Sequence, residues 1–272
     1  MNIVFEQEEI DHFLRRINVT PTAISPEYLK QIVSGIIEHI PFQNVSMLTN
    51  DWVRPSETTI KSDMLSGLGG LCTVRNPFLH EFLRELGFKV RFVSSTISEP
   101  DCHISIIVDI EGEEWWVDVG NGYPYCEPIR LGDKTTKTNW FMSYRLERVE
   151  DRYFVYHKMK NSSWKINHHF SPEAVDYSIF DRMHELHYSV PGWGPFLIGL
   201  RINRFWGDGG AVIRDERAVC PTGETVLDTV DKLETWLNEW FPKSGFMDTV
   251  DIRSADKIWR RERSKWYNGN NC

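Results

Sequence analysis

The stretch from Gly69 to Ile97 reads GGLCTVRNPFLHEFLRELGFKVRFVSSTI, and the hydrophobic period of the chain changes within it. Its first half carries apolar residues at the spacing of one helical face, namely Val74, Phe78, Leu79, Phe82, Leu83 and Leu86. These predict a helix that begins near Cys72 and is closed by Gly87, because glycine tolerates the left-handed conformation that often ends a helix. From Lys89 the apolar residues alternate or form β-branched runs, as in strands. We therefore predict an α+β fold that becomes β-rich near residue 89.

A second helix is predicted upstream of this stretch. Ser25 is a residue type favoured at helix N-caps, and Pro26 follows at the first helical position, where a missing N–H does no harm. Apolar residues then recur at helical spacing up to Ile40, and Pro41 ends the pattern. The segment between the two helices, residues 48–71, shows no period and is expected to be irregular.

Downstream, short strand patterns follow one another without an internal repeat or a Gly/Ser linker. They cover residues 90–97, 103–110, 115–119, 141–149, 153–158, 200–205 and 211–213, with turns at 111–112 and 206–210. Residues 226–240 show the pattern of a late amphipathic helix. Because no linker separates these parts, we expect them to pack as one body.

The composition restricts the classes of function. The chain has 272 residues and a net charge of −8, which repels polyphosphate, so we expect no nucleic-acid partner. Its hydrophobic fraction of 41% excludes a disordered or collagen-like chain. The opening residues, MNIVFEQEEIDHF, do not resemble a signal peptide, and no apolar run of about 18 residues predicts a membrane span. We expect a cytoplasmic protein, and no pattern indicates its oligomeric state.

The cysteines and histidines predict neither disulfides nor a metal site. Cysteine occurs five times, at positions 72, 102, 126, 220 and 272, and forms no Cys-x-x-Cys pair. This argues against a disulfide framework and a zinc knuckle, and it favours free thiols in a reducing compartment. His184 and His187 lie three residues apart but outside a His-Glu-x-x-His pattern, so no metal is assigned to them.

Cys72 has the position of a nucleophile. It is predicted in the first turn of a helix, where unpaired N–H groups and the positive end of the helix dipole favour the nucleophilic thiolate. Gly69 and Gly70 precede it and allow backbone or substrate to approach closely. The alternative is that Cys72 is a small core residue, as most isolated cysteines are.

The hairpin predicted after residue 102 brings partners toward this thiol. With Glu111 and Gly112 as its turn, the numbers of paired residues sum to 223. His103 and Asp118 are then diagonal neighbours on one face, near enough for the carboxylate to orient the imidazole as a base. Cys102 points to the opposite face. The alternative is an ordinary surface histidine beside a polar strand residue.

Segments spread over most of the chain together resemble the arylamine N-acetyltransferase family. Cys72, His103 and Asp118 follow one another in the chain order of a cysteine nucleophile, its base and the residue that orients the base. The matching segments are Phe13-Leu14-Arg15-Arg16-Ile17, Ile40-Pro41-Phe42-Gln43-Asn44-Val45, Gly69-Gly70-Leu71-Cys72, Leu86-Gly87-Phe88, His103, Val117-Asp118-Val119-Gly120-Asn121-Gly122, Pro195-Phe196 and Leu200 to Arg204. The specific elements are Gly-Gly-x-Cys, the histidine and Asp-x-Gly-x-Gly.

The resemblance implies a reaction and a fold. Cys72 would carry a thioester, with His103 as its base and Asp118 as the residue that orients the base. The family transfers acetyl from acetyl-CoA to an aromatic amine, a hydrazine or an N-hydroxyarylamine in two half-reactions. The implied fold has a cysteine-protease-like core, with a helical bundle at residues 1–88, a β-barrel at 89–199 and an α/β lid at 200–272.

The resemblance also implies where the substrates bind. Backbone N–H groups of a glycine turn are expected to approach CoA at Gly120, Gly122 and Tyr123. An aromatic acceptor is expected to contact residues in matched segments or near them, namely Phe42, Trp193 and Phe196. The alternatives are an ordinary turn and ordinary core packing.

The chain departs from the family pattern around these positions. Leu68 stands where the family has Arg, and Gln43 stands where it has Glu. Losing one member of a buried charge pair costs about 3–5 kcal/mol, whereas replacing both is nearly neutral, so we expect the fold to be kept. Asn121 replaces an aromatic residue, and Thr73-Val74-Arg75 follows the cysteine in place of aromatic-Glu-Gln. These changes leave the acyl donor and the acceptor open.

Three other functions are compatible with the same residues. The first is a biosynthetic amide synthase of this fold that takes a bulkier acyl group from another thioester or from a carrier protein. The second is a thiol hydrolase in which water replaces the amine. The third is a binding module without catalysis, for which a Cys72→Ala variant would keep full function.

Overall fold

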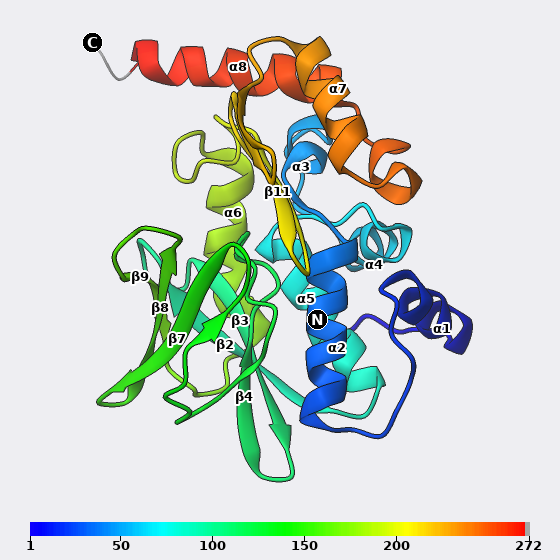
Figure 1. The fold of residues 1–272 in the computed structure, drawn as a ribbon, viewed down its shortest axis with the longest axis vertical. Helices are drawn as coiled ribbons and strands as arrows, with labels where there is room; N and C mark the ends of the chain where they lie inside the picture. The colour runs from blue at the N-terminus through cyan, green and yellow to red at the C-terminus, as the bar shows by residue number, and fades with distance from the viewer. Residues whose placement is uncertain (270–272) are drawn as a thin grey trace.

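The computed structural model describes residues 1–269, and Figure 1 shows the chain passing from helices at its N-terminus to two sheets and a final pair of helices. Cys72, Cys102, Cys126 and Cys220 are free thiols, as predicted. Cys272 lies outside the described residues. No described helix has the length and apolar character needed to cross a bilayer.

The first 88 residues are helical apart from one short strand. The elements are α1 (Gln7–Arg16), α2 (Pro26–His39), β1 (Phe42–Gln43), α3 (Val45–Thr49), α4 (Glu57–Ser66) and α5 (Cys72–Glu85). The Ser25 side chain accepts a hydrogen bond from the backbone N–H of Tyr28 at 3.1 Å, which confirms the predicted N-cap of α2. α5 begins at Cys72, and Gly87 beyond its end has a φ of +90°, as predicted.

The prediction of an irregular segment at residues 48–71 is wrong, because α4 lies within it. Ser56 caps this helix by accepting a hydrogen bond from the N–H of Thr59 at 3.1 Å. Ile60 and Met64 are its buried residues. Since the apolar stripe is only two residues long, the sequence shows no period there.

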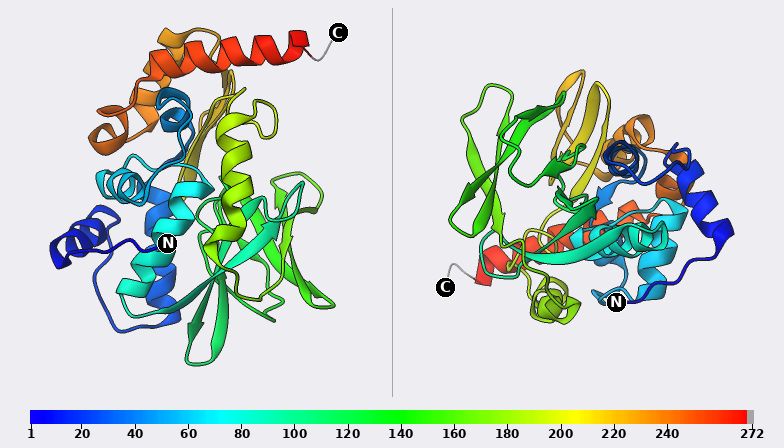
Figure 2. Two further views of the ribbon diagram at one scale, coloured as in Figure 1. Left: turned by 180° about the vertical axis from the view of Figure 1, so that it is seen from behind. Right: turned by 90° about the horizontal axis from the view of Figure 1, so that it is seen from below.

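The middle of the chain forms an eight-stranded antiparallel sheet. Its strands are β2 (Lys89–Thr96), β3 (His103–Ile110), β4 (Glu113–Val117), β5 (Ile129–Arg130), β6 (Lys137–Thr138), β7 (Met142–Val149), β8 (Arg152–Met159) and β9 (Lys165–Phe170). They are arranged in the order β5-β4-β3-β2-β9-β8-β7-β6. The sheet curls, as the views in Figures 1 and 2 show, with β5 and β6 at its two edges. In place of the expected closed β-barrel, the structure has an open, curled sheet.

The hairpin between β3 and β4 has the predicted register. Ile106 pairs with Val117 and Ile110 pairs with Glu113, so the paired numbers sum to 223. Glu111 has a φ of +55° and Gly112 a φ of +85°, the backbone of a tight two-residue turn. This turn fixes which residues of the two strands lie opposite one another.

A second antiparallel sheet joins the end of the chain to the segment before Cys72. Its order is β1-β10-β11-β12-β13, with β10 (Arg201–Trp206), β11 (Gly209–Arg214), β12 (Arg217–Cys220) and β13 (Gly223–Val226). Phe42 of β1 pairs with Asn203 of β10. Because Trp206 pairs with Gly209, the turn is shorter than the predicted 206–210.

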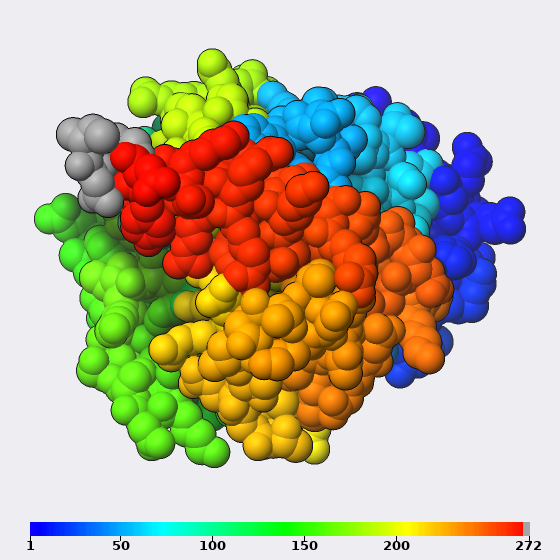
Figure 3. Space-filling view, turned by 90° about the horizontal axis from the view of Figure 1, so that it is seen from above, coloured from blue at the N-terminus to red at the C-terminus, as the bar shows by residue number. Residues whose placement is uncertain are grey.

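Helices cover this second sheet. The remaining elements are the short helix η1 (Tyr177–Phe180), α6 (Asp181–Ser189), α7 (Val230–Trp240), the turn η2 (Lys243–Met247) and α8 (Ile252–Gly269). Seen from above, α8 (red) and α7 (orange) lie beside the strands of the five-stranded sheet (gold) in Figure 3, and the buried residues of the two helices share one apolar cluster with those of β10, β11 and β12. α7 begins at Val230 and not at the predicted Val226, because the Thr229 side chain caps it by accepting from the N–H of Lys232 at 3.3 Å.

α5 lies between the two sheets. It packs against β2 and β3, and its residues from Cys72 to Leu83 are all buried. Gly70, just before this helix, forms a parallel bridge with Phe42 of the other sheet. The N-terminus of α5 therefore lies where both sheets meet.

Candidate active site

Cys72 is the first residue of α5. The preceding residue, Leu71, is the N-cap and is extended, and it offers no side-chain cap to the helix. The N–H groups of the first turn are therefore not occupied by a capping side chain. Cys72 is 5% exposed and packs among the apolar side chains of Phe92, Ile104 and Tyr177.

His103 and Asp118 form a hydrogen bond to each other next to this thiol. His103 is the first residue of β3, and Asp118 follows directly after the end of β4. The Nε2 atom of His103 lies 2.6 Å from Oδ2 of Asp118, and both side chains are buried. Since Nε2 is engaged by the carboxylate, Nδ1 is the ring nitrogen left for Cys72. The structure thus brings the three predicted residues together.

The charges of these three groups are coupled. Burial alone would lower the pKa of His103, but the charge and hydrogen bond of Asp118, together with the Cys72 sulfur, raise it well above its usual range. Burial likewise favours the neutral form of Asp118, and the charge of His103 overcomes this and lowers the pKa of the carboxyl. The environment therefore favours a charged imidazolium on His103 beside a charged carboxylate on Asp118, and an imidazolium is the partner that activates a cysteine thiol.

Asn76 holds this arrangement in place and is a residue that the sequence analysis missed. Its Nδ2 atom donates to Oδ1 of Asp118 at 2.9 Å and to the carbonyl oxygen of Ile104 at 2.6 Å. Its Oδ1 atom accepts from the N–H of Val119 at 3.0 Å. Asn76 lies four residues after Cys72 on α5, so helical spacing was the available signal.

Gly120 packs directly against the nucleophile. A Cβ atom at this position would lie 2.6 Å from Cα of Cys72 and 2.7 Å from Nδ2 of Asn76. Gly122 has a φ of +79°, and its Cβ would lie 2.9 Å from the ring of Phe42. The Tyr123 ring contacts Arg214, whose guanidinium lies 5.2 Å from the ring centre, and His157, whose ring lies 4.6 Å away.

Gly120→Ala is expected to lower kcat at least tenfold, because the added methyl meets backbone of α5 that cannot move without displacing Cys72. The destabilisation should be about 1–3 kcal/mol. Gly112→Ala is the matched control, since it has a φ of +85° but no atom within 4 Å of the added Cβ. It should lose stability from backbone strain alone and keep full kcat. Equal kcat losses in the two variants would contradict the contact with Cys72.

Two of the three predicted acceptor residues contact one histidine, and the third contacts one of those two. The rings of Phe42 and Phe196 are 6.2 Å apart, and Phe196 and Trp193 lie 5.2 Å and 4.6 Å from the ring of His187. Burial, with the charges of neighbouring histidines, lowers the pKa of His187 to about 3, so this ring is neutral. From sequence, His187 was predicted only not to bind a metal, and its place among these aromatic rings follows from the packing of α6.

Gln43 and Leu68, the two departures from the family pattern near Gly69 and Gly70, make neutral contacts. The Gln43 amide donates to Oγ of Ser46 at 2.7 Å and accepts from the Ser46 N–H at 3.0 Å. It also lies 3.5 Å from the carbonyl oxygen of Leu68. The Leu68 side chain packs in the apolar cluster beneath α7 and α8. Asn121, the third departure, places its Nδ2 atom 3.5 Å from Nε2 of His103.

Gln43→Glu is expected to destabilise the fold by about 3 kcal/mol, because it buries a carboxylate beside the carbonyl of Leu68 without a cation. Adding Leu68→Arg to this variant should recover at least about 1 kcal/mol relative to the sum of the single changes. Urea denaturation of the four proteins measures both values. Strict additivity would show that positions 43 and 68 are not coupled.

A further histidine lies beside Asp118. His168 of β9 is buried, and its Nε2 atom lies 4.0 Å from Oδ2 of Asp118 without a hydrogen-bond partner. One ligand atom each from His103, Asp118 and His168 lies within 4.8 Å of the others. The 2.6 Å separation of His103 and Asp118 is shorter than the roughly 3.3 Å between two ligands of tetrahedral zinc. The spacing is therefore that of a hydrogen bond, and the absence of a metal site stays a prediction.

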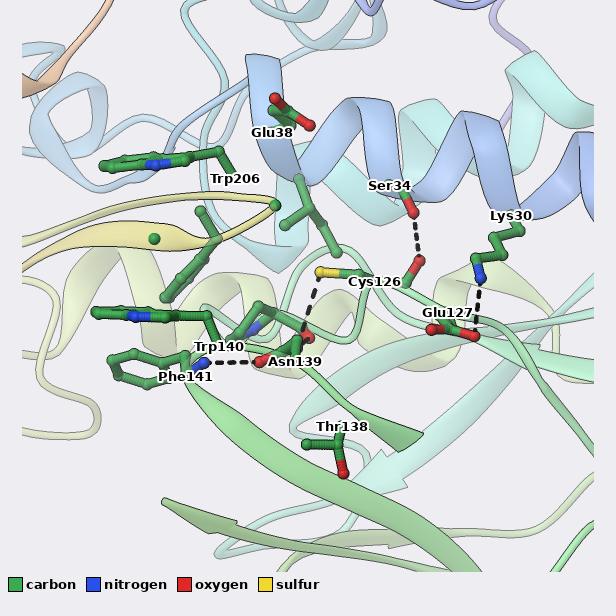
Figure 4. Close-up of a pocket in the computed structure, with 15 residues that line it drawn as sticks. Lys30, Ser34, Glu38, Cys126, Glu127, Thr138, Asn139, Trp140, Phe141 and Trp206 are labelled. Carbon is green, nitrogen blue, oxygen red and sulfur yellow. Dashed lines mark hydrogen bonds and ion pairs between the residues drawn. The ribbon is translucent and has the colours of Figure 1, made fainter. Parts of the chain in front are cut away.

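A separate cavity of about 240 Å³ lies between α2 and the turn joining β10 and β11 (Figure 4). Trp140 and Trp206 line it, and at its other end Lys30 pairs with Glu127 at 3.1 Å. None of the predicted site residues lines this cavity. The chemistry of Cys72 is therefore not placed there.

Comparisons with known proteins show which family the chain resembles. A family model described as N-acetyltransferase matches residues 26–242. An arylamine N-acetyltransferase of Escherichia coli is 26% identical over 170 residues, which cover 59% of this chain and 57% of the relative. Proansamycin X synthase of Amycolatopsis mediterranei is 24% identical over 183 residues, which cover 62% of this chain and 70% of the relative.

Solved structures show the same fold. An arylamine N-acetyltransferase from Salmonella typhimurium superposes with a TM-score of 0.82 at 19% identity, covering 94% of this chain and 100% of the other. The Mycobacterium marinum arylamine N-acetyltransferase in complex with CoA superposes with a TM-score of 0.78 at 19% identity, covering 93% and 98%. Because the family model matches most of the residues and the fold agrees, the chain belongs to the arylamine N-acetyltransferase family of acyltransferases.

Proposed function

We propose that the chain transfers an acetyl group from acetyl-CoA, through a thioester on Cys72, to an arylamine, a hydrazine or an N-hydroxyarylamine. The observation that carries this proposal is the imidazole of His103, which is held at 2.6 Å by Asp118 and interacts with the Cys72 sulfur. A thiol, its base and the residue that orients the base are the elements needed for covalent acyl transfer.

In the first half-reaction, the Cys72 thiolate attacks the acetyl carbonyl carbon of acetyl-CoA. The bond between that carbon and the CoA sulfur breaks, and His103 donates its proton to the departing sulfur. CoA leaves as a thiol and Cys72 keeps the acetyl group. The N–H groups of Val74 and Arg75 donate to the carbonyl oxygen of Leu71, so the N–H groups of Cys72 and Thr73 are the ones we expect to donate to the substrate carbonyl oxygen as it gains negative charge.

In the second half-reaction, the amine nitrogen attacks the thioester carbon. His103, now neutral, accepts the proton that the nitrogen loses, and the bond between the carbon and the Cys72 sulfur breaks. The products are the acetylated amine and a thiolate beside an imidazolium. The enzyme thus returns to its starting charges without any added reactant.

The substrate contacts are part of the same proposal. We place CoA along the turn of Gly120, Gly122 and Tyr123, supported by a relative of the same fold that was solved with CoA. We place the acceptor beside Phe42, Trp193 and Phe196, since Trp193 and Phe196 both contact His187 and Phe42 contacts Phe196. The proposal also includes a cysteine-protease-like core and a division of the chain into segments 1–88, 89–199 and 200–272. It further includes a cytoplasmic location, which the free thiols support.

A synthase that uses another acyl thioester is the second candidate. Proansamycin X synthase matches 62% of this chain, slightly more than the Escherichia coli arylamine N-acetyltransferase does. In addition, Asn121 replaces an aromatic residue beside His103, so the surroundings of the base differ from the family pattern.

Initial rates with varied acetyl-CoA and varied arylamine test the proposal. Parallel lines in double-reciprocal plots are expected, because CoA leaves before the amine reacts. The same assay with a bulky acyl-CoA separates the two candidates. A kcat/KM at least tenfold higher for the bulky donor would favour the synthase, and CoA release at a rate independent of amine would favour a hydrolase.

A further inference from the structure

Arg75 is a buried cation one helical turn after the nucleophile. Its side chain is 2% exposed, and its guanidinium donates to the carbonyl oxygen of Val119 at 2.5 Å and to that of Ile40. No ion pair involves Arg75 within residues 1–269. A guanidinium buried among carbonyl groups alone is unfavourable, so its position calls for a negative charge at longer range.

Asp118 is that negative charge. Burial lowers the pKa of Arg75 to about 9, and the charge of Asp118 opposes this effect. Arg75 therefore stays protonated at neutral pH. Val119, whose carbonyl Arg75 binds, is the residue next to Asp118, so the guanidinium also fixes the backbone that presents the carboxylate.

The charges that face Asp118 change during the proposed reaction. Before acylation, the Cys72 thiolate and the His103 imidazolium neutralise each other, and the Asp118 carboxylate remains to be balanced. After acylation, Cys72 is a neutral thioester and His103 has given its proton to CoA. The carboxylate then has no charged imidazolium beside it.

The neighbouring titratable groups do not replace that imidazolium. Burial lowers the pKa of His168 and of His187 to about 3 and that of His184 to about 4, so all three rings are neutral. Burial raises the pKa of the Tyr125 hydroxyl, which is therefore also neutral. Arg75 is the group that keeps a positive charge throughout.

We propose that Arg75 is a positioning residue that balances the charge of Asp118 while Cys72 is acylated, so that His103 can stay neutral and accept the proton of the amine. This inference rests on the proposed function.

Removing the charge of Arg75 should change the pKa of His103 in a definite direction. In Arg75→Gln, the carboxylate of Asp118 should hold a proton on His103 more tightly, which raises the pKa of His103 in the acylated state. A rise of about 0.5–1 unit would slow discharge of the thioester by amine about three- to tenfold at neutral pH. The pH dependence of the rate should shift to higher pH only for the discharge of the thioester. The first half-reaction, in which Cys72 is acetylated, already starts with a protonated His103.

The test measures His103 directly by NMR titration of its imidazole in a Cys72→Ala background, which lacks the thiolate as the acylated enzyme does. Arg75→Gln should raise the pKa of His103 by about 0.5–1 unit, and Arg75→Lys should leave it unchanged. Arg204→Gln is the matched control, since Arg204 donates to the carbonyls of Glu38 at 2.9 Å and Trp240 at 3.2 Å. Should the Gln variant not fold, Arg75→Met repeats the measurement with more of the side-chain volume kept.

An unchanged pKa of His103 in Arg75→Gln or Arg75→Met would overturn the inference, and so would an equal rise in Arg204→Gln. Neither result depends on acetyl-CoA. Failure of the wild-type enzyme to form a thioester would instead contradict the proposed function and leave the titration of His103 to decide the role of Arg75.

Discussion

Replacing Cys72 with serine is expected to lower kcat/KM for acetyl transfer at least about 10⁴-fold, because a hydroxyl at this position is far less nucleophilic than a thiolate. Since Cys72 is buried, the loss of stability should be about 1 kcal/mol. Steady-state kinetics and thermal unfolding of the same preparation measure the two effects.

Cys102→Ser is the matched control for this variant. Cys102 is also buried and precedes His103 directly, but its sulfur accepts a hydrogen bond from the N–H of Ile97 at 3.2 Å. It should keep kcat within about twofold, because a change in stability at this position does not alter the groups that react. Comparable losses in both variants would show that Cys72 acts through packing.

Replacing Asp118 with asparagine is expected to lower kcat on the order of 10³-fold with little change in shape. The carboxylate and its hydrogen bond raise the pKa of His103 against the effect of burial. Without them, burial dominates and His103 becomes neutral at physiological pH, so the thiolate loses its imidazolium. Alkylation of Cys72 by iodoacetamide, followed from pH 5 to 9, should then require a higher pH than in the wild type.

The same variant makes a prediction about stability. The stabilisation from the raised pKa of His103 is present in full below about pH 6.5, the ordinary value, and is lost as the pH rises through the raised value. The stabilisation from the lowered pKa of Asp118 is present above about pH 3.9 and is lost as the pH falls through the lowered value. The stability difference between wild type and variant should therefore be largest between about pH 4 and 6.5. A difference that is constant with pH would contradict the ion pair.

The hairpin that carries His103 and Asp118 was predictable from sequence, because its turn is local. A two-residue loop at Glu111 and Gly112 fixes the register, and the register fixes which side chains share a face. The start of α5 at Cys72 was predictable for a similar reason, since its apolar stripe is long and Gly87 closes it.

Other parts depend on contacts between distant segments. β9 pairs with β2, about 70 residues earlier, and this pairing is what brings His168 to Asp118. Nothing in the alternation of β9 itself indicates that partner. Asn76 is similar, because its amide bridges α5 to the ends of two strands, and its helical spacing from Cys72 does not indicate which strand atoms it binds.

The position of β1 also could not be predicted from the sequence. Two residues give no period, so Phe42 and Gln43 could not be recognised as a strand, yet they form the edge of the sheet built from the end of the chain. This pairing explains how one glycine turn can contact both the nucleophile, through Gly120, and the ring of Phe42, through Gly122.

Intact-protein mass spectrometry after incubation with acetyl-CoA tests the central claim most directly. Wild-type protein should gain one acetyl group that peptide mapping places on Cys72, and an arylamine such as aniline should remove it, while Cys72→Ala stays unmodified. An adduct on another residue, or a wild-type protein that remains unmodified although Cys72 reacts with iodoacetamide, would contradict acetyl transfer from acetyl-CoA through Cys72.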